Sequence, residues 1–344
     1  MRALHTGPLN LTTRCEQWPL VRPFHIAGHT FEVLETLWLE LEQRGCAGNA
    51  EAAGVYYQDV FPRTMIAQIE AIRPEIEGGL TLRRVQELLP AGGARNALDC
   101  ALWDLLAKVL KRPVWQLAEL CAPKPLLTTF ACGAETPEAM ARAAEGYVEA
   151  RAIKLKLTGE PIDADRVRAV REARPDVWLG VDGNQGFTRA ALEKLMPELV
   201  AARVALIEQP FPVGEESLLQ TLDCPIDIAA DESVQGVDDL ASLGDKFDVV
   251  NIKLDKCGGL TEALLMAEQA KRRGLEAMIG NMIGTSLAMA PAYLVGQLCT
   301  VVDLDGPIFL REDRAQHGFY KNGFLHCPES VWGAADSASE PESD

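Results

Sequence analysis

The sequence lacks the cysteine and histidine patterns that indicate disulfides or a zinc site. Its nine cysteines include no CxxC pair, and neither they nor the five histidines have zinc-ligand spacing. The chain also has no apolar run long enough to cross a bilayer, and residues 1–7 contain no signal-peptide core. We therefore expect reduced thiols, a cytoplasmic location and no membrane partner.

Positive charge is scarce as well. Against 33 Lys and Arg there are 50 Asp and Glu, which gives a formal net charge of −17. Nucleic acids and anionic membranes are bound by clustered Lys and Arg, so the charge balance argues against both as partners. Residues 333–344 are small, polar and acidic, which predicts a disordered tail.

What the chain does contain is a ladder of evenly spaced apolar runs with charged residues at their ends. The runs recur about every 25 residues, the length of one strand, one helix and two short loops. Parallel strands of a barrel present their carboxyl ends at one mouth, so we expect the charged residues to converge there. They are, in chain order, Lys154 and Lys156, Asp182, Glu208, Asp231 and Lys253.

This alternation predicts an α/β fold: a (β/α)7β TIM-type barrel with an N-terminal α+β capping domain. We expect the capping domain over residues 1–122 and the barrel over residues 123–305. Residues 306–332, with a small hairpin near 318–325, are expected to pack back on the capping domain and complete it. The other expected elements are a hairpin at residues 31–51, helices at 64–117, 163–173, 190–200 and 261–271, and strands at 126–131, 276–280 and 300–305.

Three acidic residues, Asp182, Glu208 and Asp231, occupy matched positions in successive units, and we call them the carboxylate triad. Carboxylates without His or Cys nearby are the hard oxygen ligands that Mg²⁺ prefers. Any one of them alone could cap a helix or lie in a solvated loop, but three matched positions favour a Mg²⁺ site. Asn184 is either a supporting ligand or a turn residue.

The lysines at the strand ends are candidate proton carriers. Lys154 and Lys156 are one residue apart, so they face the same side of a strand. Burial and mutual repulsion are expected to lower the pKa of each ammonium, and a neutral amine near pH 7 is a usable general base. Lys253 ends a strand on the opposite side of the barrel, where it could be a second base or pair with a carboxylate. Lys256, in the following loop, is interpreted as structural.

Asp303 and Asp305 are also one residue apart and share a face of the expected last strand. Two further carboxylates at a mouth that already holds the triad require a cation. A second metal or an ammonium group on the substrate would serve, whereas a pair that only caps the final loop would need neither.

These motifs resemble the enolase superfamily, specifically its muconate-lactonizing subgroup, over nearly the whole chain. The subgroup carries Lys-x-Lys on the second barrel strand, Asp, Glu and Asp on the next three, and a lysine motif on the sixth. Here that last motif reads Asn-Ile-Lys-Leu-Asp-Lys-Cys-Gly-Gly over residues 251–259. Glu208-Gln209-Pro210 and Ala230-Asp231-Glu232-Ser233 add to the match. Asp303-Leu304-Asp305 resembles the Asp-x-Asp of dipeptide epimerases, which binds the substrate's α-ammonium.

The resemblance implies a Mg²⁺-dependent epimerase that inverts the α-carbon of a dipeptide's C-terminal residue by 1,1-proton transfer through an enolate. Lys156 and Lys253 would serve opposite faces of that carbon, Lys154 would support Lys156, and the carboxylate triad would hold Mg²⁺. Asp303, Asp305 and His29 would bind the small-molecule substrate; a homo-oligomer is also implied. Epimerases specific for Ala-Glu resemble one another in a capping-loop arginine, and this sequence has Gly28 or His29 there.

Three other functions compete with this interpretation. An N-acyl amino acid racemase uses the same lysines but has no ammonium to bind. A muconate cycloisomerase or an o-succinylbenzoate synthase-type lyase needs lysine on only one face. A Schiff-base aldolase built on Lys253 would leave the carboxylate triad without a role.

Overall fold

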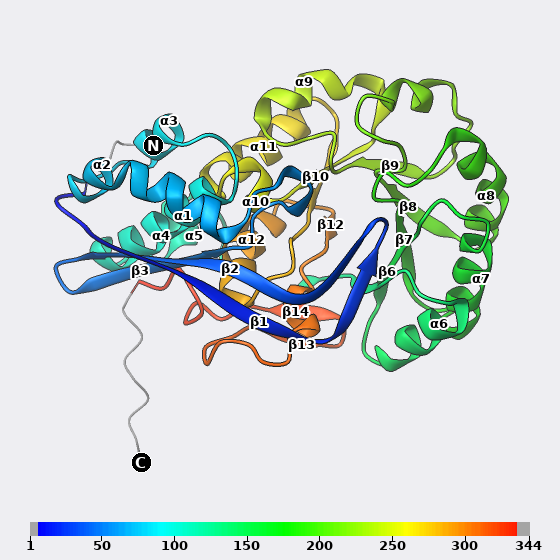
Figure 1. The fold of residues 1–344 in the computed structure, drawn as a ribbon, viewed down its shortest axis with the longest axis horizontal. Helices are drawn as coiled ribbons and strands as arrows, with labels where there is room; N and C mark the ends of the chain where they lie inside the picture. The colour runs from blue at the N-terminus through cyan, green and yellow to red at the C-terminus, as the bar shows by residue number, and fades with distance from the viewer. Residues whose placement is uncertain (1–5, 336–344) are drawn as a thin grey trace, which may run out of the picture.

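The computed structural model describes residues 6–335, which form a capping domain packed beside a barrel (Figure 1). The capping domain contains an antiparallel sheet in the order β1 (Asn10–Ile26), β2 (His29–Gln43), β3 (Cys46–Ala52). The pairing of β2 with β3 confirms the expected hairpin. The long edge strand β1 was not predicted, because it is mostly exposed and its prolines, which an edge strand tolerates, interrupt the pattern.

Helices cover the other side of this sheet, and α4 is the one that joins the two parts of the molecule. Nearly all of α4 is buried, since it lies between β3 and the barrel helices. Gly48 on β3 permits the close approach, because a Cβ there would lie 2.3 Å from the carbonyl oxygen of Ala101. The capping-domain helices are η1 (Tyr56–Gln58), α1 (Pro62–Ala71), α2 (Arg73–Glu77), α3 (Leu82–Leu88), α4 (Gly93–Leu110) and α5 (Val114–Leu117).

The barrel is a parallel eight-stranded sheet whose strands follow one another in chain order. Its two ends meet where the backbone N–H of Thr129, just before the first strand, donates to the carbonyl of Val302 on the last strand at 2.9 Å. The predicted TIM-type fold is therefore confirmed. The barrel strands are β5 (Phe130–Cys132), β6 (Ala152–Lys156), β7 (Trp178–Asp182), β8 (Val204–Glu208), β9 (Asp227–Ala230), β10 (Val249–Ile252), β11 (Glu276–Ile279) and β12 (Val301–Val302).

Helices connect these strands on the outside of the barrel (Figure 1). The helices expected at 163–173, 190–200 and 261–271 are all present, but the connection after β8 has only the 3-10 helix η2 in place of an α-helix. No helix among residues 6–335 is long and apolar enough to span a membrane. The connecting helices are α6 (Pro137–Gly146), α7 (Asp163–Ala173), α8 (Arg189–Ala201), η2 (Glu216–Thr221), η3 (Val237–Asp239), α9 (Leu240–Leu243), η4 (Gly244–Lys246), α10 (Leu254–Cys257), α11 (Leu260–Arg272) and α12 (Ser286–Gly296).

Two details of the expected strands are wrong. The strand expected at 126–131 is split: β4 (Leu126–Leu127) belongs to a separate antiparallel sheet, and only β5 enters the barrel. The reason is that the buried hydroxyl of Thr128, between the two, bonds to the β12 segment and turns the chain inward. The expected hairpin, β13 (Phe319–Lys321) and β14 (Phe324–His326), is present but pairs with β4 rather than with the capping domain.

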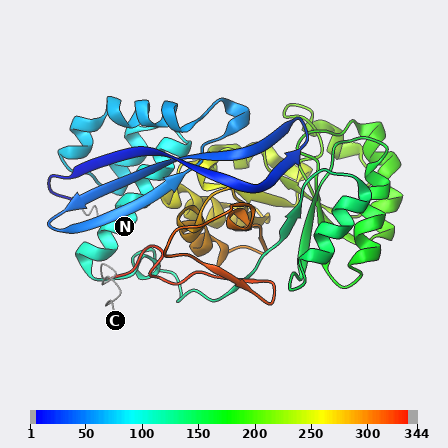
Figure 2. The ribbon, with the colours of Figure 1, turned by 60° about the horizontal axis from the view of Figure 1, so that its bottom comes forward.

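The chain nevertheless returns to the capping domain on either side of that hairpin (Figure 2). After η5 (Gly306–Phe309), Leu310 pairs with Leu20 of β1. Farther on, the N–H of Gly333 donates to the carboxylate of Asp104 on α4 at 2.8 Å. Gly333 was the expected start of the acidic tail, and it is held here; residues 336–344 of that tail lie outside the described residues.

Candidate active site

The carboxyl ends of the barrel strands carry the predicted residues, and the register of the sheet brings them level. Lys156 at the end of β6 pairs with Asp182 at the end of β7, which in turn pairs with Glu208 at the end of β8. Asp231 directly follows β9, and Lys253 directly follows β10. The carboxylate triad is fully buried, with exposed fractions of 0 %, 0 % and 1 %. The convergence that the spacing predicts is thus present.

Lys154 and Lys156 both point inward from β6 and both contact carboxylates. The Nζ of Lys156 lies 2.6 Å from an oxygen of Asp182. The Nζ of Lys154 lies 3.0 Å from Glu208 and also contacts Asp303. Burial alone would lower the pKa of Lys154, but the charges of Asp303, Glu208 and Asp182 outweigh burial and hold that pKa well above its usual range. The lowered pKa expected for Lys154 is therefore wrong in this arrangement, because carboxylates surround its ammonium.

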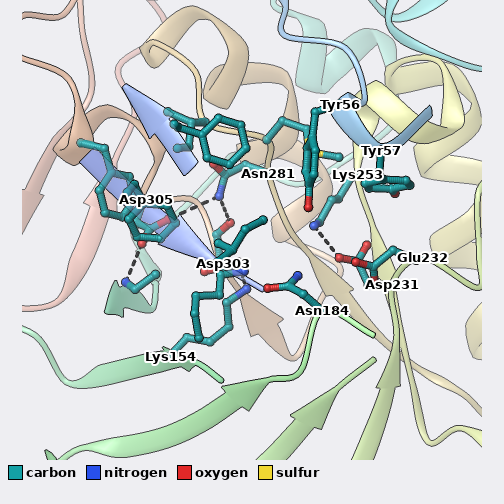
Figure 3. Close-up of a pocket in the computed structure, with 18 residues that line it drawn as sticks. Tyr56, Tyr57, Lys154, Asn184, Asp231, Glu232, Lys253, Asn281, Asp303 and Asp305 are labelled. Atoms are coloured by element: carbon teal, nitrogen blue, oxygen red, sulfur yellow. Dashed lines mark hydrogen bonds and ion pairs between the residues drawn. The ribbon is translucent and has the colours of Figure 1, made fainter. Parts of the chain in front are cut away.

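Lys253 approaches from the opposite side of the barrel. Its strand, β10, stands four places from β6 in the eight-strand order, which is half-way around the barrel. Its Nζ lies 2.6 Å from one oxygen of Asp231, while the Nζ of Lys256 lies 2.5 Å from the other. Figure 3 shows Lys154 beside Asp303 on one side of the pocket and Lys253 beside Asp231 on the other. Burial opposes the charged form of Lys253, but Asp231 and Glu208 raise its pKa well above its usual range.

Burial and neighbouring charges shift the pKa values of the carboxylate triad in different directions. Burial, followed by the charge of Asp182, raises the pKa of Glu208 to about 7, although Lys154 opposes the rise. Asp231 has the opposite balance: burial acts against its charged form, but Lys253 and Lys256 hold its pKa well below its usual range. Crowded, buried carboxylates of this kind are stabilised by nearby positive charge, which the lysines supply here.

The donor set of the triad fits Mg²⁺, which takes carboxylate oxygens as ligands. Among residues 6–335, however, no three His, Cys, Asp or Glu side chains lie at metal-ligand spacing. The contacts explain this, because Lys154, Lys156 and Lys253 already engage the triad's oxygens. Asn184 adopts the left-handed turn conformation considered for it, with a φ of 40°. Its Oδ1 is also buried without a hydrogen-bond partner in the described part of the chain, so this oxygen is available as a further metal ligand.

Asp303 and Asp305 lie just after β12 and face into the same pocket, but their environments differ. The carboxylate of Asp303 contacts Lys154 and the hydroxyl of Thr129, and despite burial the charges of Lys154 and then Lys156 lower its pKa. Asp305 accepts the backbone N–H of Ala131 at 2.6 Å. Burial and then the charge of Asp303 raise the pKa of Asp305 to about 7. Asp303 is therefore already paired with a lysine, whereas the charged form of Asp305 would be stabilised by an additional cation.

The capping domain closes the pocket above these barrel residues. Phe24 and Ile26 at the end of β1 and Phe31 on β2 supply apolar and aromatic walls. Tyr56 and Tyr57 on η1 add two further aromatic rings (Figure 3). The space that these walls enclose has a volume of about 60 Å³, which is below the roughly 300–1,000 Å³ typical of small-molecule sites. A small polar substrate would therefore find charged groups at the base and apolar walls above.

His29 is the predicted substrate-binding residue that the structure does not bring into this pocket. It is exposed at the start of β2 and stacks on Tyr56, with ring centroids 4.6 Å apart, and packs edge-on against Phe31 at 4.4 Å. It lines a neighbouring cavity instead, with those two rings standing between it and the lysines. The prediction placed His29 in a free loop, whereas it belongs to a β-hairpin whose register directs it outward.

Several residues of the site were not predicted. Asn251 donates to Glu208 at 2.7 Å, and Asn281 donates to the backbone of Asp303. Asn251 stands two residues before Lys253 on the same strand face, a spacing that could have identified it. Lys256, taken as structural, contacts Asp231 directly. Tyr56 and Tyr57 carry no sequence signal, because nothing in their short segment fixes where it lies over the barrel.

Two family models match the chain. The N-terminal domain of the mandelate racemase / muconate lactonizing enzyme family matches residues 9–118, and the enolase C-terminal domain-like family matches residues 138–330. The first match lies within the part described as the capping domain, and the second covers barrel strands β6 to β12 and the chain that follows them. The predicted resemblance to the enolase superfamily is thus confirmed.

Curated relatives carry the names of epimerases and racemases, which are isomerases. The L-Ala-D/L-Glu epimerase of Escherichia coli is 37% identical over 313 residues, covering 90% of this chain and 97% of the relative. The N-acetyl-D-glutamate racemase of a Pseudoalteromonas species is 41% identical over 262 residues, covering 75% of this chain and 82% of the relative.

Solved structures agree with this kinship. An enolase family member from Agrobacterium tumefaciens with homology to dipeptide epimerases, solved with sodium and L-Ala-L-Glu, superposes with a TM-score of 0.91 at 36% identity. The match covers 95% of this chain and all of that one. The dipeptide epimerase of Methylococcus capsulatus, complexed with Mg and L-Arg-D-Lys, gives 0.88 at 29% identity, covering 96% and 99%. The chain therefore belongs to the mandelate racemase / muconate lactonizing enzyme family of the enolase superfamily.

Proposed function

We propose that the protein is a Mg²⁺-dependent epimerase that inverts the α-carbon of the C-terminal residue of a dipeptide by 1,1-proton transfer. The observation that carries the proposal is the placement of Lys156 and Lys253. They stand at the ends of strands half-way around the barrel from each other, both buried, with the carboxylate triad between them. A carbon acid bound between two such amines can lose a proton to one and gain a proton from the other on its opposite face.

The residues of the site have distinct tasks in this reaction. Asp182, Glu208 and Asp231 would hold Mg²⁺, which stabilises the negative charge that develops on the substrate carboxylate when the α-proton leaves. Lys156 and Lys253 alternate as base and acid, each serving one face of the α-carbon. The amine that acts as base must first be neutral.

The other groups orient the substrate so that its α-carbon faces the lysines, and they exclude water from the site. Lys154 lies between Glu208 and Asp303 and places a second positive charge near Lys156. It can also contact the substrate carboxylate. Asp303 and Asp305 bind the α-ammonium of the dipeptide's first residue. The aromatic walls of the capping domain exclude water, so that the lysines exchange protons with the substrate rather than with solvent.

An N-acyl amino acid racemase is the second candidate, and one contact favours it. Asp303 is already paired with Lys154, so the Asp-x-Asp pair has one carboxylate fewer for a substrate ammonium. The relative that acts on N-acetyl-D-glutamate is also consistent with it. The dipeptide is preferred because Asp305 has no lysine or arginine partner among residues 6–335, and its charged form needs one.

The deciding experiment compares matched substrates in D₂O with Mg²⁺. Dipeptides and N-acetyl amino acids that share the same C-terminal residue are incubated with the enzyme, and deuterium at the α-carbon and inversion are followed by mass spectrometry and chiral chromatography. The proposal expects exchange with inversion on the dipeptides at much the higher kcat/KM. Preference for the N-acetyl series would establish the racemase, and loss of water or ring chemistry without inversion would overturn both.

We also propose that the enzyme works in the cytoplasm as a homo-oligomer. All nine cysteines are free thiols, which is compatible with a reducing compartment. Sedimentation velocity at several concentrations tests the assembly, and a single species with the mass of one chain would contradict it.

A further inference from the structure

Gln209 occupies an unusual place between the members of the carboxylate triad. It follows Glu208 at the end of β8, is 1 % exposed, and does not line the substrate pocket. Its φ is 30°, in the left-handed region that a residue with a side chain seldom adopts. A strained backbone at a buried position persists only where the surroundings hold it in place. The contacts of Gln209 identify those surroundings.

The side-chain amide of Gln209 makes three of its four hydrogen bonds to the segment that carries Asp231. Its Oε1 accepts the backbone N–H of Asp231 at 2.9 Å and that of Ser233 at 3.1 Å. Its Nε2 donates to the hydroxyl of Ser233 at 2.8 Å and to the carbonyl of Phe211 at 2.9 Å. The loop after β9 is therefore held by one side chain that reaches across from β8.

The backbone of Gln209 extends the connection to both sides. Its N–H donates to the carbonyl of Ala229 on β9, and its carbonyl accepts the N–H of Gln185 in the loop after Asp182, both at 2.9 Å. Gln209 is thus covalently joined to Glu208, hydrogen-bonded to the amide of Asp231, and hydrogen-bonded to the loop that begins at Asp182. One residue touches all three segments that carry the triad.

From this geometry we infer that Gln209 is a positioning residue that sets the spacing of the carboxylate triad for a divalent cation. The inference deepens the proposed function, because it rests on Mg²⁺ binding at the triad. Gln209 contacts neither the pocket nor the carboxylate oxygens. It acts through the backbone, by fixing where Asp231 leaves β9 relative to Glu208. Loss of such outer-shell partners generally weakens metal affinity about 10- to 100-fold.

The test is Gln209→Met, which keeps the length and volume of the side chain but removes its amide. Isothermal titration calorimetry with Mg²⁺ alone should give a Kd about 10- to 100-fold weaker than that of the unaltered enzyme. In kinetics, the concentration of Mg²⁺ for half-maximal rate should rise by a similar factor, while the rate at saturating Mg²⁺ stays near its original value. A residue that only stabilises the fold would not produce this split.

Gln297→Met is the matched control. Gln297, at the end of α12, also binds backbone through both ends of its amide, accepting the N–H of Lys124 at 3.0 Å and donating to the carbonyls of Lys124 and Tyr293. The same substitution there removes equivalent bonds away from the triad. It should lower thermal stability without changing the Mg²⁺ Kd.

The outcomes separate the inference from the proposed function. If the unaltered enzyme binds no Mg²⁺, the proposed function fails. If it binds Mg²⁺ and Gln209→Met binds equally well, the role of Gln209 fails while the proposed function stands. Should Gln209→Met not fold, Gln209→Asn, which keeps the amide but is too short to reach the amide of Asp231, is expected to show the weaker Kd. Failure of both variants to fold would assign Gln209 to general stability and overturn the inference.

Discussion

The barrel and the capping domain build opposite walls of one pocket in different ways. The barrel's contribution is periodic: strands β6 to β10 and β12 each deliver a charged group at the carboxyl end, and the parallel register brings neighbours such as Asp182 and Glu208 level. The capping domain's contribution comes from a hairpin tip and one short 3-10 segment, which deliver aromatic rings such as Phe31 and Tyr56. The difference separates chemistry from selectivity. In the proposed function, the groups that move protons stand on rigid strands, and the groups that meet the substrate's side chains stand on connections that tolerate change.

Removing the opposed lysines should have the largest effect, because they belong to the periodic wall. Lys156→Met and Lys253→Met should each reduce epimerisation roughly 10²- to 10⁴-fold, the usual contribution of a positioned acid or base. Each variant should still exchange the α-proton of one substrate epimer, namely the epimer whose proton faces the lysine that remains. Proton NMR in D₂O, run separately on both epimers, measures this.

An exposed lysine on α8, Lys194, provides the control for that experiment. Lys194→Met should leave both exchange rates unchanged. If both active-site variants lost exchange from the same epimer, the two amines would serve one face, and the idea of opposed walls within the barrel would be broken.

Asp305→Asn should have the next largest effect, and it depends on the substrate. A charged hydrogen bond contributes about 1.5–3 kcal/mol, so kcat/KM for dipeptides should fall roughly 10- to 100-fold. N-acetylated substrates carry no ammonium and should be unaffected. Because the pKa of Asp305 is about 7, more of it is ionised as the pH rises, and the KM for dipeptides should fall between about pH 6 and pH 8 in the unaltered enzyme only. An equal loss on both substrate classes would contradict an ammonium-binding role.

The same contrast decides how much could be predicted from the sequence. The repeat of apolar runs is enough to predict the barrel and the alignment of its charged strand ends. It also predicts that Lys154 and Lys156 point inward. The place of His29 could not be predicted, because it depends on the register of β1 with β2. That register shifts between Pro19 and Phe24, where no local pattern in the sequence marks it. Where a hairpin tip comes to lie over another domain is the part that composition and spacing do not encode.

The seam between capping domain and barrel can be tested through pH. Asp99 on α4 is buried against α11, where it accepts the N–H and hydroxyl of Thr261 at 2.9 and 2.6 Å, and burial raises its pKa to about 7. In the unfolded chain the same carboxyl ionises near pH 4. Between these values the folded state binds more protons, so its stability should fall as pH rises, by up to about 1.4 kcal/mol per pH unit from this group.

Denaturant unfolding at several pH values checks the sign. Asp99→Asn should flatten the decline between about pH 4 and pH 7, because the amide does not titrate. Asp245→Asn, at an exposed acid, should leave the decline unchanged. If Asp99→Asn kept the full pH dependence, Asp99 would not be the group that takes up the proton in the folded state.

The smallest effect should come from His29→Ala, which decides between sequence and structure at the capping wall. His29 is exposed and touches the pocket through its ring contacts with Tyr56 and Phe31, each worth about 0.5–1.5 kcal/mol. Only part of this contact energy affects the position of the Tyr56 ring, so kcat/KM of His29→Ala for dipeptides should change about threefold or less.

Tyr56→Ala removes an aromatic ring from the pocket wall. It should raise KM for the same substrates by about tenfold or more, since a ring in contact with substrate is lost. The two variants are compared on dipeptides with acidic, basic and apolar C-terminal residues. A large loss confined to acidic dipeptides in His29→Ala would mean that the hairpin tip turns inward when substrate binds, and that His29 meets the distal carboxylate as the sequence predicted. Small changes in kcat/KM of His29→Ala on all three dipeptide classes would instead assign selectivity to the aromatic rings. The capping wall would then distinguish substrates by shape rather than by charge.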